Sequence, residues 1–144
     1  MRHSPRVAAV LPLLVVLAAC SDDDPTGPED FECGDSPVLT LGTPTTGTLQ
    51  SGDDLDVDGA YLDRYSLVLE AATVIQIDME SDAVDAFLWL RTEAGSMIEL
   101  NDDGGNDLNA RIVESLQAGC FIVDATSADP DDVGGYTLLV AAQI

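Results

Sequence analysis

The chain has 144 residues, of which 27 are acidic and five are arginine or lysine, so its formal net charge at pH 7 is −22. Nucleic acids and anionic membrane surfaces attract proteins with an excess of positive charge, and we therefore expect no nucleic-acid partner. The length suits one domain with a core large enough to fold without a structural metal.

The first nineteen residues have the layout of an export signal. Two arginines and a histidine form a basic start, and residues 7–19 form an apolar run that is too short to span a membrane. The run ends Leu17-Ala18-Ala19-Cys20, which resembles the lipobox of bacterial lipoproteins. The resemblance implies removal of residues 1–19 and acylation of Cys20, for example by palmitate. The protein would then be exported and anchored by lipid in the cell envelope. The alternative is an ordinary secretory signal with an incidental cysteine.

Cleavage after residue 19 changes the composition. It leaves 144 − 19 = 125 residues, with all 27 acidic residues but only 5 − 2 = 3 arginines. The only histidine is lost, and the chain contains no lysine. A mature chain of this composition has no histidine-based triad, Ser-Lys dyad, imidazole zinc site or Schiff-base lysine. We therefore expect a protein that is not an enzyme.

Residues 20–36, between the signal and the domain, are acidic, contain proline and glycine, and are almost without apolar side chains. This composition predicts a flexible tether. Once Cys20 carries lipid, Cys33 and Cys120 remain, and an oxidising exported compartment favours a disulfide between them. The alternative is two unpaired thiols.

Residues 37–144 form a series of short β patterns separated by glycine, aspartate or asparagine at intervals of about ten residues, which is typical of an antiparallel sandwich or barrel. No stretch after residue 20 keeps a helical apolar period over ten positions. The candidate strands are Val38–Leu41, Thr46–Leu49, Arg64–Leu69, Val74–Glu80, Ala86–Thr92, Met97–Asn101, Arg111–Leu116, Phe121–Ser127 and Tyr136–Ala142.

The strand register of one hairpin can be predicted from the sequence. Ala86–Thr92 and Met97–Asn101 are joined by a three-residue loop that ends in Gly95, which suits the left-handed position of such loops. The resulting register pairs Leu90 with Ile98, Leu88 with Leu100 and Asp85 with Asp103. It places the four aliphatic side chains on one face. A shift by one residue would set two of them against polar residues, so we expect the unshifted register.

The order of these motifs resembles the bacterial pre-peptidase C-terminal domain. The matching residues are Asp63-x-Tyr65-x-Leu67-x-Leu69, Asp85-x-Phe87-Leu88-x-Leu90, Asn101-Asp102-Asp103, Ala118-Gly119-x-Phe121 and Gly135-Tyr136-x-Leu138-x-Val140, which span about Gly47 to Val140. The resemblance implies a jelly-roll β-sandwich of about eight or nine strands that is not catalytic. Some members bind polymers such as collagen, and some bind calcium. No protease precedes the domain in these 144 residues, so a targeting role does not carry over. Ala72 and Cys120 also depart from the usual glycine and threonine.

Two acidic clusters are candidate calcium sites, because calcium prefers six to eight oxygen ligands. The main cluster comprises Asp85, Asn101, Asp102, Asp103, Asn106 and Asp107. The weaker cluster comprises Asp54, Asp56 and Asp58, which copy half of an EF-hand loop but have Tyr65 where the bidentate glutamate belongs. In each case the alternative is a turn in which the side chains bond to the backbone without metal.

The candidate ligand surface is the face of the hairpin opposite the aliphatic side chains, where Phe87, Trp89 and Arg91 lie. The alternative is that another strand or the N-terminal segment covers them. We expect a monomeric, lipid-anchored binding or adhesion module that is not an enzyme and whose ligand is a protein or polysaccharide. The alternatives are a structural envelope lipoprotein without a ligand and a glycoside hydrolase that uses two carboxylates, for example Asp85 and Asp103.

Overall fold

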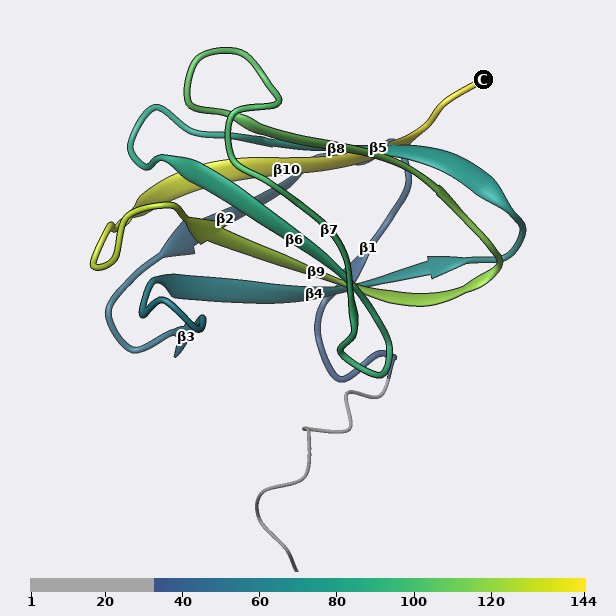
Figure 1. The fold of residues 1–144 in the computed structure, drawn as a ribbon, viewed down its shortest axis with the longest axis horizontal. Coiled ribbons are helices and arrows are strands. Elements are labelled where there is room, and N and C mark those ends of the chain that lie inside the picture. The colour runs from purple at the N-terminus through teal and green to yellow at the C-terminus, as the bar shows by residue number, and fades with distance from the viewer. Residues whose placement is uncertain (1–32) are drawn as a thin grey trace, which may run out of the picture.

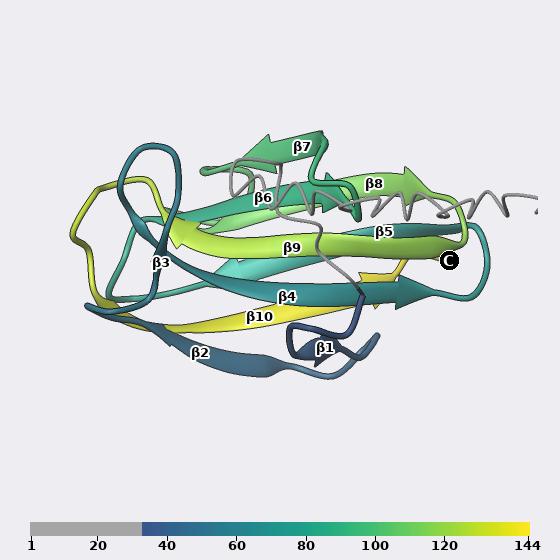
Figure 2. The ribbon, with the colours of Figure 1, turned by 90° about the horizontal axis from the view of Figure 1, so that it is seen from below.

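The computed structural model describes residues 33–144, which form two β-sheets packed face to face (Figures 1 and 2). Sheet A has the strand order β1-β4-β9-β6-β7, with β3 paired to β4, and sheet B has the order β2-β10-β5-β8. The strands are β1 (Val38–Leu39), β2 (Thr45–Leu49), β3 (Asp54–Leu55), β4 (Tyr61–Leu69), β5 (Thr73–Glu80), β6 (Ala86–Thr92), β7 (Met97–Asn101), β8 (Ala110–Leu116), β9 (Gly119–Ser127) and β10 (Gly134–Ala142). In this part of the chain, no helix is long and apolar enough to cross a membrane.

The predicted all-β sandwich is confirmed. Every strand pairing is antiparallel except that of β1 with β4. From β4 onward the chain crosses repeatedly between the sheets, as in a jelly roll: β4 is in sheet A, β5 in B, β6 and β7 in A, β8 in B, β9 in A and β10 in B. All nine predicted strands are present, and only the two-residue β3 was not predicted.

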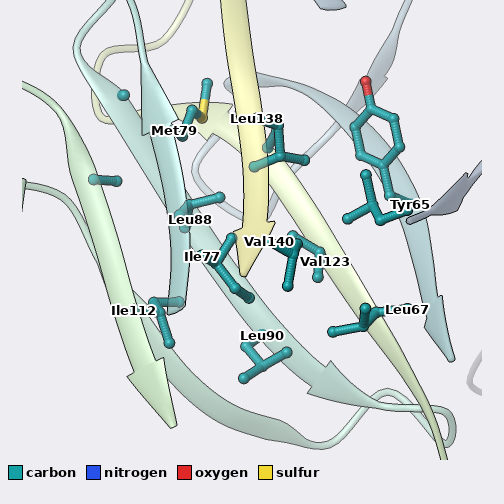
Figure 3. Packing of buried hydrophobic residues seen from close by; sticks show 14 of the residues in the cluster. Tyr65, Leu67, Ile77, Met79, Leu88, Leu90, Ile112, Val123, Leu138 and Val140 are labelled. Atoms are coloured by element: carbon teal, nitrogen blue, oxygen red, sulfur yellow. The ribbon is translucent and has the colours of Figure 1, made fainter. Parts of the chain in front are cut away.

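The core lies between the two sheets, and period-two alternation along the strands creates it. Leu67, Leu88 and Val123 point inward from sheet A and meet Ile77 and Leu138 from sheet B (Figure 3). These five side chains are fully buried. Complete burial of such a side chain contributes roughly 1.5–3 kcal/mol, so the interlocked faces supply most of the stabilisation.

The β6–β7 register was predicted correctly only at the turn. Arg91 pairs with Met97, and Gly95 has the expected positive φ of 80°. Beyond that point a bulge shifts the pairing by one residue, so that Leu90 lies opposite Glu99 and Leu88 lies opposite Asn101. The predicted pairs of Leu90 with Ile98, Leu88 with Leu100 and Asp85 with Asp103 are therefore wrong.

The bulge has a hydrogen-bonding cause. In the shifted register the side-chain amide oxygen Oδ1 of Asn101 accepts hydrogen bonds from the backbone N–H groups of Gly104 (2.6 Å) and Arg111 (3.0 Å). These bonds connect the end of β7 to the start of β8. The cost is that Leu100 moves to the outer face opposite Trp89, where it is 37% exposed.

A buried polar contact joins the two sheets at one end of the core. The Tyr136 hydroxyl on β10 donates a hydrogen bond to Asp63 on β4 (2.6 Å) and lies 2.7 Å from the Tyr65 hydroxyl. Burial raises the pKa of Asp63, although the bond from Tyr136 opposes that rise. Burial and the bond to Asp63 raise the pKa of Tyr136, so this phenol stays protonated and keeps donating.

Candidate functional site

The outward-facing residues of sheet A form a row across three central strands. The register places Arg64 of β4 beside Asp124 of β9, and Asp124 beside Trp89 of β6. In the next row Arg91 of β6 lies beside Ile122 of β9. We call Phe87, Trp89, Arg91, Arg64 and Asp124 the outer-face patch.

Asp124 organises this patch. Its carboxylate is completely buried and receives three hydrogen bonds, from Arg64 Nε (2.7 Å), Arg64 Nη2 (3.2 Å) and Arg91 Nε (3.1 Å). The two arginine side chains remain 22% and 21% exposed. Charge-assisted bonds of this kind hold a guanidinium in a defined plane. The arrangement therefore fixes two cationic groups at the surface of a strongly acidic protein.

Aromatic side chains extend the patch along β6. The Arg91 guanidinium carbon lies 4.7 Å from the centre of the Trp89 ring, in a cation–π contact. Phe87 and Trp89 have ring centres 5.5 Å apart and are tilted by 46°. All three side chains are half-buried. A surface with two neighbouring aromatic rings and a fixed guanidinium suits flat or anionic groups of a ligand.

The structure brings together the three residues predicted for ligand contact, but the sequence did not identify Arg64 or Asp124. Both lie on strands that are about 60 residues apart in sequence, so no local motif connects them. One signal was available. Asp124 is the single charged residue inside the apolar run of β9, and a charge buried in a central strand needs a partner.

The predicted disulfide is present at the edge of the patch. Cys33 is bonded to Cys120 of β9, with 6.0 Å between their Cα atoms. The next residue, Gly34, donates its backbone N–H to the hydroxyl of Ser66 on β4 (3.2 Å). Cys33 itself donates to the Glu93 carboxylate at the β6–β7 turn (3.4 Å). The start of the described chain is therefore held on the outer face of sheet A.

The weaker acidic cluster forms a turn. Asp56 Oδ1 accepts hydrogen bonds from the backbone N–H groups of Asp58 and Ala60, both 2.9 Å long. Asp54 lies in β3, where it pairs with Leu62. These bonds are those of a capped β3–β4 hairpin loop, which was the alternative to a calcium loop.

The main acidic cluster is distributed along the β7–β8 loop. Asn101 accepts two backbone N–H groups, and Asp102 Oδ1 accepts the N–H of Asp103 (2.8 Å). A side chain at Gly104 would clash with Asn101, since a Cβ there would lie 2.4 Å from Asn101 Oδ1. Asp107 adopts a positive φ of 56°. The loop is therefore built from internal hydrogen bonds.

Asp85 lies beside this loop in an acidic hollow. The lining of the hollow includes Asp82, Asp107, Asp129 and Asp132. Burial raises the pKa of Asp85, and the charges of Asp103, Asp129, Asp102 and Asp132 raise it further. Its Oδ1 atom is buried without a hydrogen-bond partner among residues 33–144. Within the same residues no group of three or more His, Cys, Asp or Glu side chains is arranged to hold a metal ion. Calcium binding therefore stays a prediction.

The predicted lipidation site, Cys20, lies outside the residues that the structure describes.

Comparison with known proteins supports the fold. No family model and no curated protein matches the sequence. The pre-peptidase C-terminal domain of a collagenase from Bacillus anthracis is similar in structure, with 18% identity and a TM-score of 0.57 over 73% of this chain and 93% of that domain. PliG of Aeromonas hydrophila, a periplasmic inhibitor of g-type lysozyme, aligns with 14% identity and a TM-score of 0.49 over 75% of this chain and 99% of PliG. The first comparison shows that the chain has the β-sandwich fold of a pre-peptidase C-terminal domain.

Proposed function

We propose that the mature chain is a lipid-anchored binding module of the cell envelope that is not an enzyme. An acyl chain on Cys20 would hold it on the membrane, and the outer-face patch would contact a protein or polysaccharide. The observation that carries the proposal is the fixed geometry of the patch, in which the buried Asp124 holds Arg91 against Trp89.

Preorganisation is what favours binding over a purely structural role. An exposed arginine ordinarily loses roughly 0.5–1.5 kcal/mol of side-chain freedom when a ligand immobilises it. Arg91 has lost much of that freedom already through Asp124 and Trp89. Trp89 and Phe87 add aromatic area on a rigid central strand. Rigid aromatic and arginine side chains are the usual anchors of protein interfaces.

The composition supports the non-catalytic part of the proposal. Residues 20–144 contain no histidine or lysine, so the common nucleophile and base pairs cannot be assembled. The arginines of the patch are donors that keep their charge at all ordinary pH values. Such groups recognise and orient a ligand, but they do not accept a proton from it.

A matched pair of variants tests the binding role. The chain from Ser21 to Ile144 contains every residue of the core and is immobilised for capture of envelope polysaccharide and detergent-solubilised envelope proteins. Arg91→Gln should reduce capture of the specific ligand. Arg111→Gln is the control, because Arg111 pairs with Asp78 on the outer face of sheet B. Equal capture by both variants and the unaltered chain would remove the patch from the proposal.

The anchor is tested separately in cells. Full-length chain should incorporate labelled palmitate and remain with the membrane fraction, and Cys20→Ser should lose both properties. Cys120→Ser is the control, since Cys120 is committed to the disulfide. Palmitate labelling that survives Cys20→Ser would contradict the lipobox assignment.

A further inference from the structure

The two ends of the sandwich differ sharply in charge. The directions of the paired strands place four loops, with β3 among them, at one end, and these loops contain twelve aspartates. We call this the acidic end, and it comprises residues 50–60, 81–85, 102–109 and 128–133. The opposite end contains three acidic residues, Asp35, Glu70 and Glu93. We call this the acid-poor end, and it comprises residues 33–37, 40–44, 70–72, 93–96 and 117–118. Figures 1 and 2 show β3 at the left and the β4–β5 turn at the right.

An apolar hollow lies at the acid-poor end, where β1 and the end of β4 meet. Its volume is about 470 Å³, and its apolar lining consists of Leu39, Leu41, Val68, Leu69 and Ala71. Glu70 is the one charged residue in the lining. Three aliphatic side chains at this edge face solvent, namely Val38 (55% exposed), Leu41 (40%) and Val68 (49%). We call these three residues the apolar strip.

The chain enters the domain beside this strip. Val68 of β4 is registered with Cys120 of β9, and Cys120 is bonded to Cys33, the first described residue. Neighbouring strands lie about 4.8 Å apart, so Cys33 joins the fold about one strand away from Val68. Cys20 precedes Cys33 by 13 residues, which span at most about 43–47 Å when fully extended. A lipid on Cys20 would therefore keep the strip close to the bilayer.

The charge distribution favours one orientation of a domain anchored in this way. The acidic end lies away from the anchor, because the eight residue steps from Leu69 back to Tyr61 along β4 cover about 26 Å. An anionic membrane surface repels carboxylates, so the acid-poor end approaches it at the lower cost. Tethering also raises the local concentration of the two surfaces, so that a contact too weak to recruit a free domain is still populated.

We propose that the apolar strip rests on the bilayer that holds the Cys20 anchor, so that the acidic end points away from the membrane. This contact rests on the anchor of the proposed function and goes beyond it, because an anchor alone leaves the orientation of the domain open. The contact also places the outer-face patch. Arg91 is registered with Ile122, two residues along β9 from Cys120, which is an offset of about 8 Å. A ligand of the patch is therefore bound close to the membrane surface.

The test couples the chain from Cys20 to Ile144 to phosphatidylcholine vesicles, through the Cys20 thiol and a maleimide lipid. Cys33 and Cys120 form the disulfide, so Cys20 is the single free thiol of this chain. A lipid without net charge is the suitable probe, because Glu70 lines the hollow. The coupling is chemical, so the contact is tested whether or not cells acylate Cys20.

Tryptophan fluorescence reports the contact. Trp89→Phe removes the only tryptophan, and Val68→Trp or Leu41→Trp then introduces a reporter into the strip. Val133→Trp is the matched control, because Val133 is 56% exposed in the β9–β10 loop at the acidic end. Bromine atoms on the lipid acyl chains quench an indole only when it lies close to them.

On brominated vesicles, Val68→Trp and Leu41→Trp should lose most of their emission and shift to shorter wavelength, while Val133→Trp should keep its emission. Val38→Ser in the Val68→Trp chain should restore much of the emission, since it removes an apolar side chain from the strip. Val113→Ser should not, because Val113 is similarly exposed (52%) but lies on β8 in sheet B. Thermal unfolding confirms that each variant is folded, and the two reporters substitute for each other.

Full emission of the strip reporters on coupled brominated vesicles would overturn the proposal. Equal quenching of Val133→Trp would also overturn it, since the domain would then have no preferred orientation. These results are independent of the palmitate experiment in cells. A failure of palmitate labelling refutes the natural anchor, whereas full emission of the coupled reporters refutes the contact.

Discussion

Replacing both Cys33 and Cys120 by serine is expected to lower the free energy of unfolding by about 4 kcal/mol. The bridge joins residues that are 87 positions apart. For a loop of that length the chain-entropy model gives about 4.6 kcal/mol at 25 °C, through restriction of the unfolded chain. A somewhat smaller value is expected because real unfolded chains keep some compactness. Domains of this size have about 5–15 kcal/mol in total, so the loss is a large fraction.

The assay is urea unfolding of the chain from Ser21 to Ile144, followed by circular dichroism. The double-serine variant should have a lower midpoint and also a steeper dependence on urea, because an unfolded chain without the cross-link exposes more surface. Unaltered protein with a reductant should give the same curve as the variant. Ser66→Ala serves as the local control, because it removes the hydrogen bond from Gly34 and leaves the cross-link in place. That control should cost about 1 kcal/mol.

The entropic reasoning is refuted if the double-serine variant loses no more stability than Ser66→Ala. It is also refuted if the urea slope stays constant while stability falls by several kcal/mol. The stabilisation would then come from contacts of the native N-terminal residues and not from the unfolded chain.

Three further predictions concern charge. Asp124→Asn should destabilise the domain by about 3 kcal/mol in urea unfolding, because it leaves two partly buried arginines without their shared carboxylate. The control, Asp78→Asn, breaks the more exposed pair with Arg111 and should cost less than about 1 kcal/mol. Equal losses of stability in the two variants would contradict this ranking. Burial and neighbouring acids raise the pKa of Asp85 above its ordinary 3.8, so the folded domain loses stability as pH rises from 3.8 through the raised pKa. Asp85→Asn should therefore melt at a higher temperature than the unaltered chain at pH 7, with the advantage vanishing below pH 3.8, and an advantage that is constant with pH would exclude titration of Asp85 as its cause. If calcium binds, the domain should melt at a higher temperature with excess calcium than with chelator, and this difference should be smaller in Asp85→Asn. Superimposable melting curves with calcium and with chelator would eliminate the site.

The strands could be predicted because alternation of apolar residues is a local property. β5, β6 and β10 each bury every second side chain, and the sequence displays that pattern directly. β3 was missed because its two exposed residues have no alternation to detect. It exists because the Asp56 turn folds it back on β4, which is an effect of side-chain hydrogen bonding.

The errors beyond β3 also trace to side-chain bonds. Hydrophobic pattern alone favours Leu100 on the inner face, but the bonds of Asn101 to Gly104 and Arg111 fix the bulged register. The patch was half predicted for a related reason. Phe87, Trp89 and Arg91 alternate on one strand, whereas Arg64 and Asp124 join them only through the pairing of β9 with β4 and β6. Pairings between distant strands depend on the whole topology, which short motifs do not carry.

The disulfide also decides how the domain resists a mechanical pull. A force applied to the chain before Cys33 passes through the bridge to Cys120 and so loads β9. β9 is hydrogen-bonded on both sides, to β4 and to β6, and its displacement requires two ladders to break. Without the bridge, the same force would first meet β1, a two-residue edge strand held only by β4. The cross-link thus transfers the load from a two-residue edge strand to a nine-residue strand that is paired on both sides.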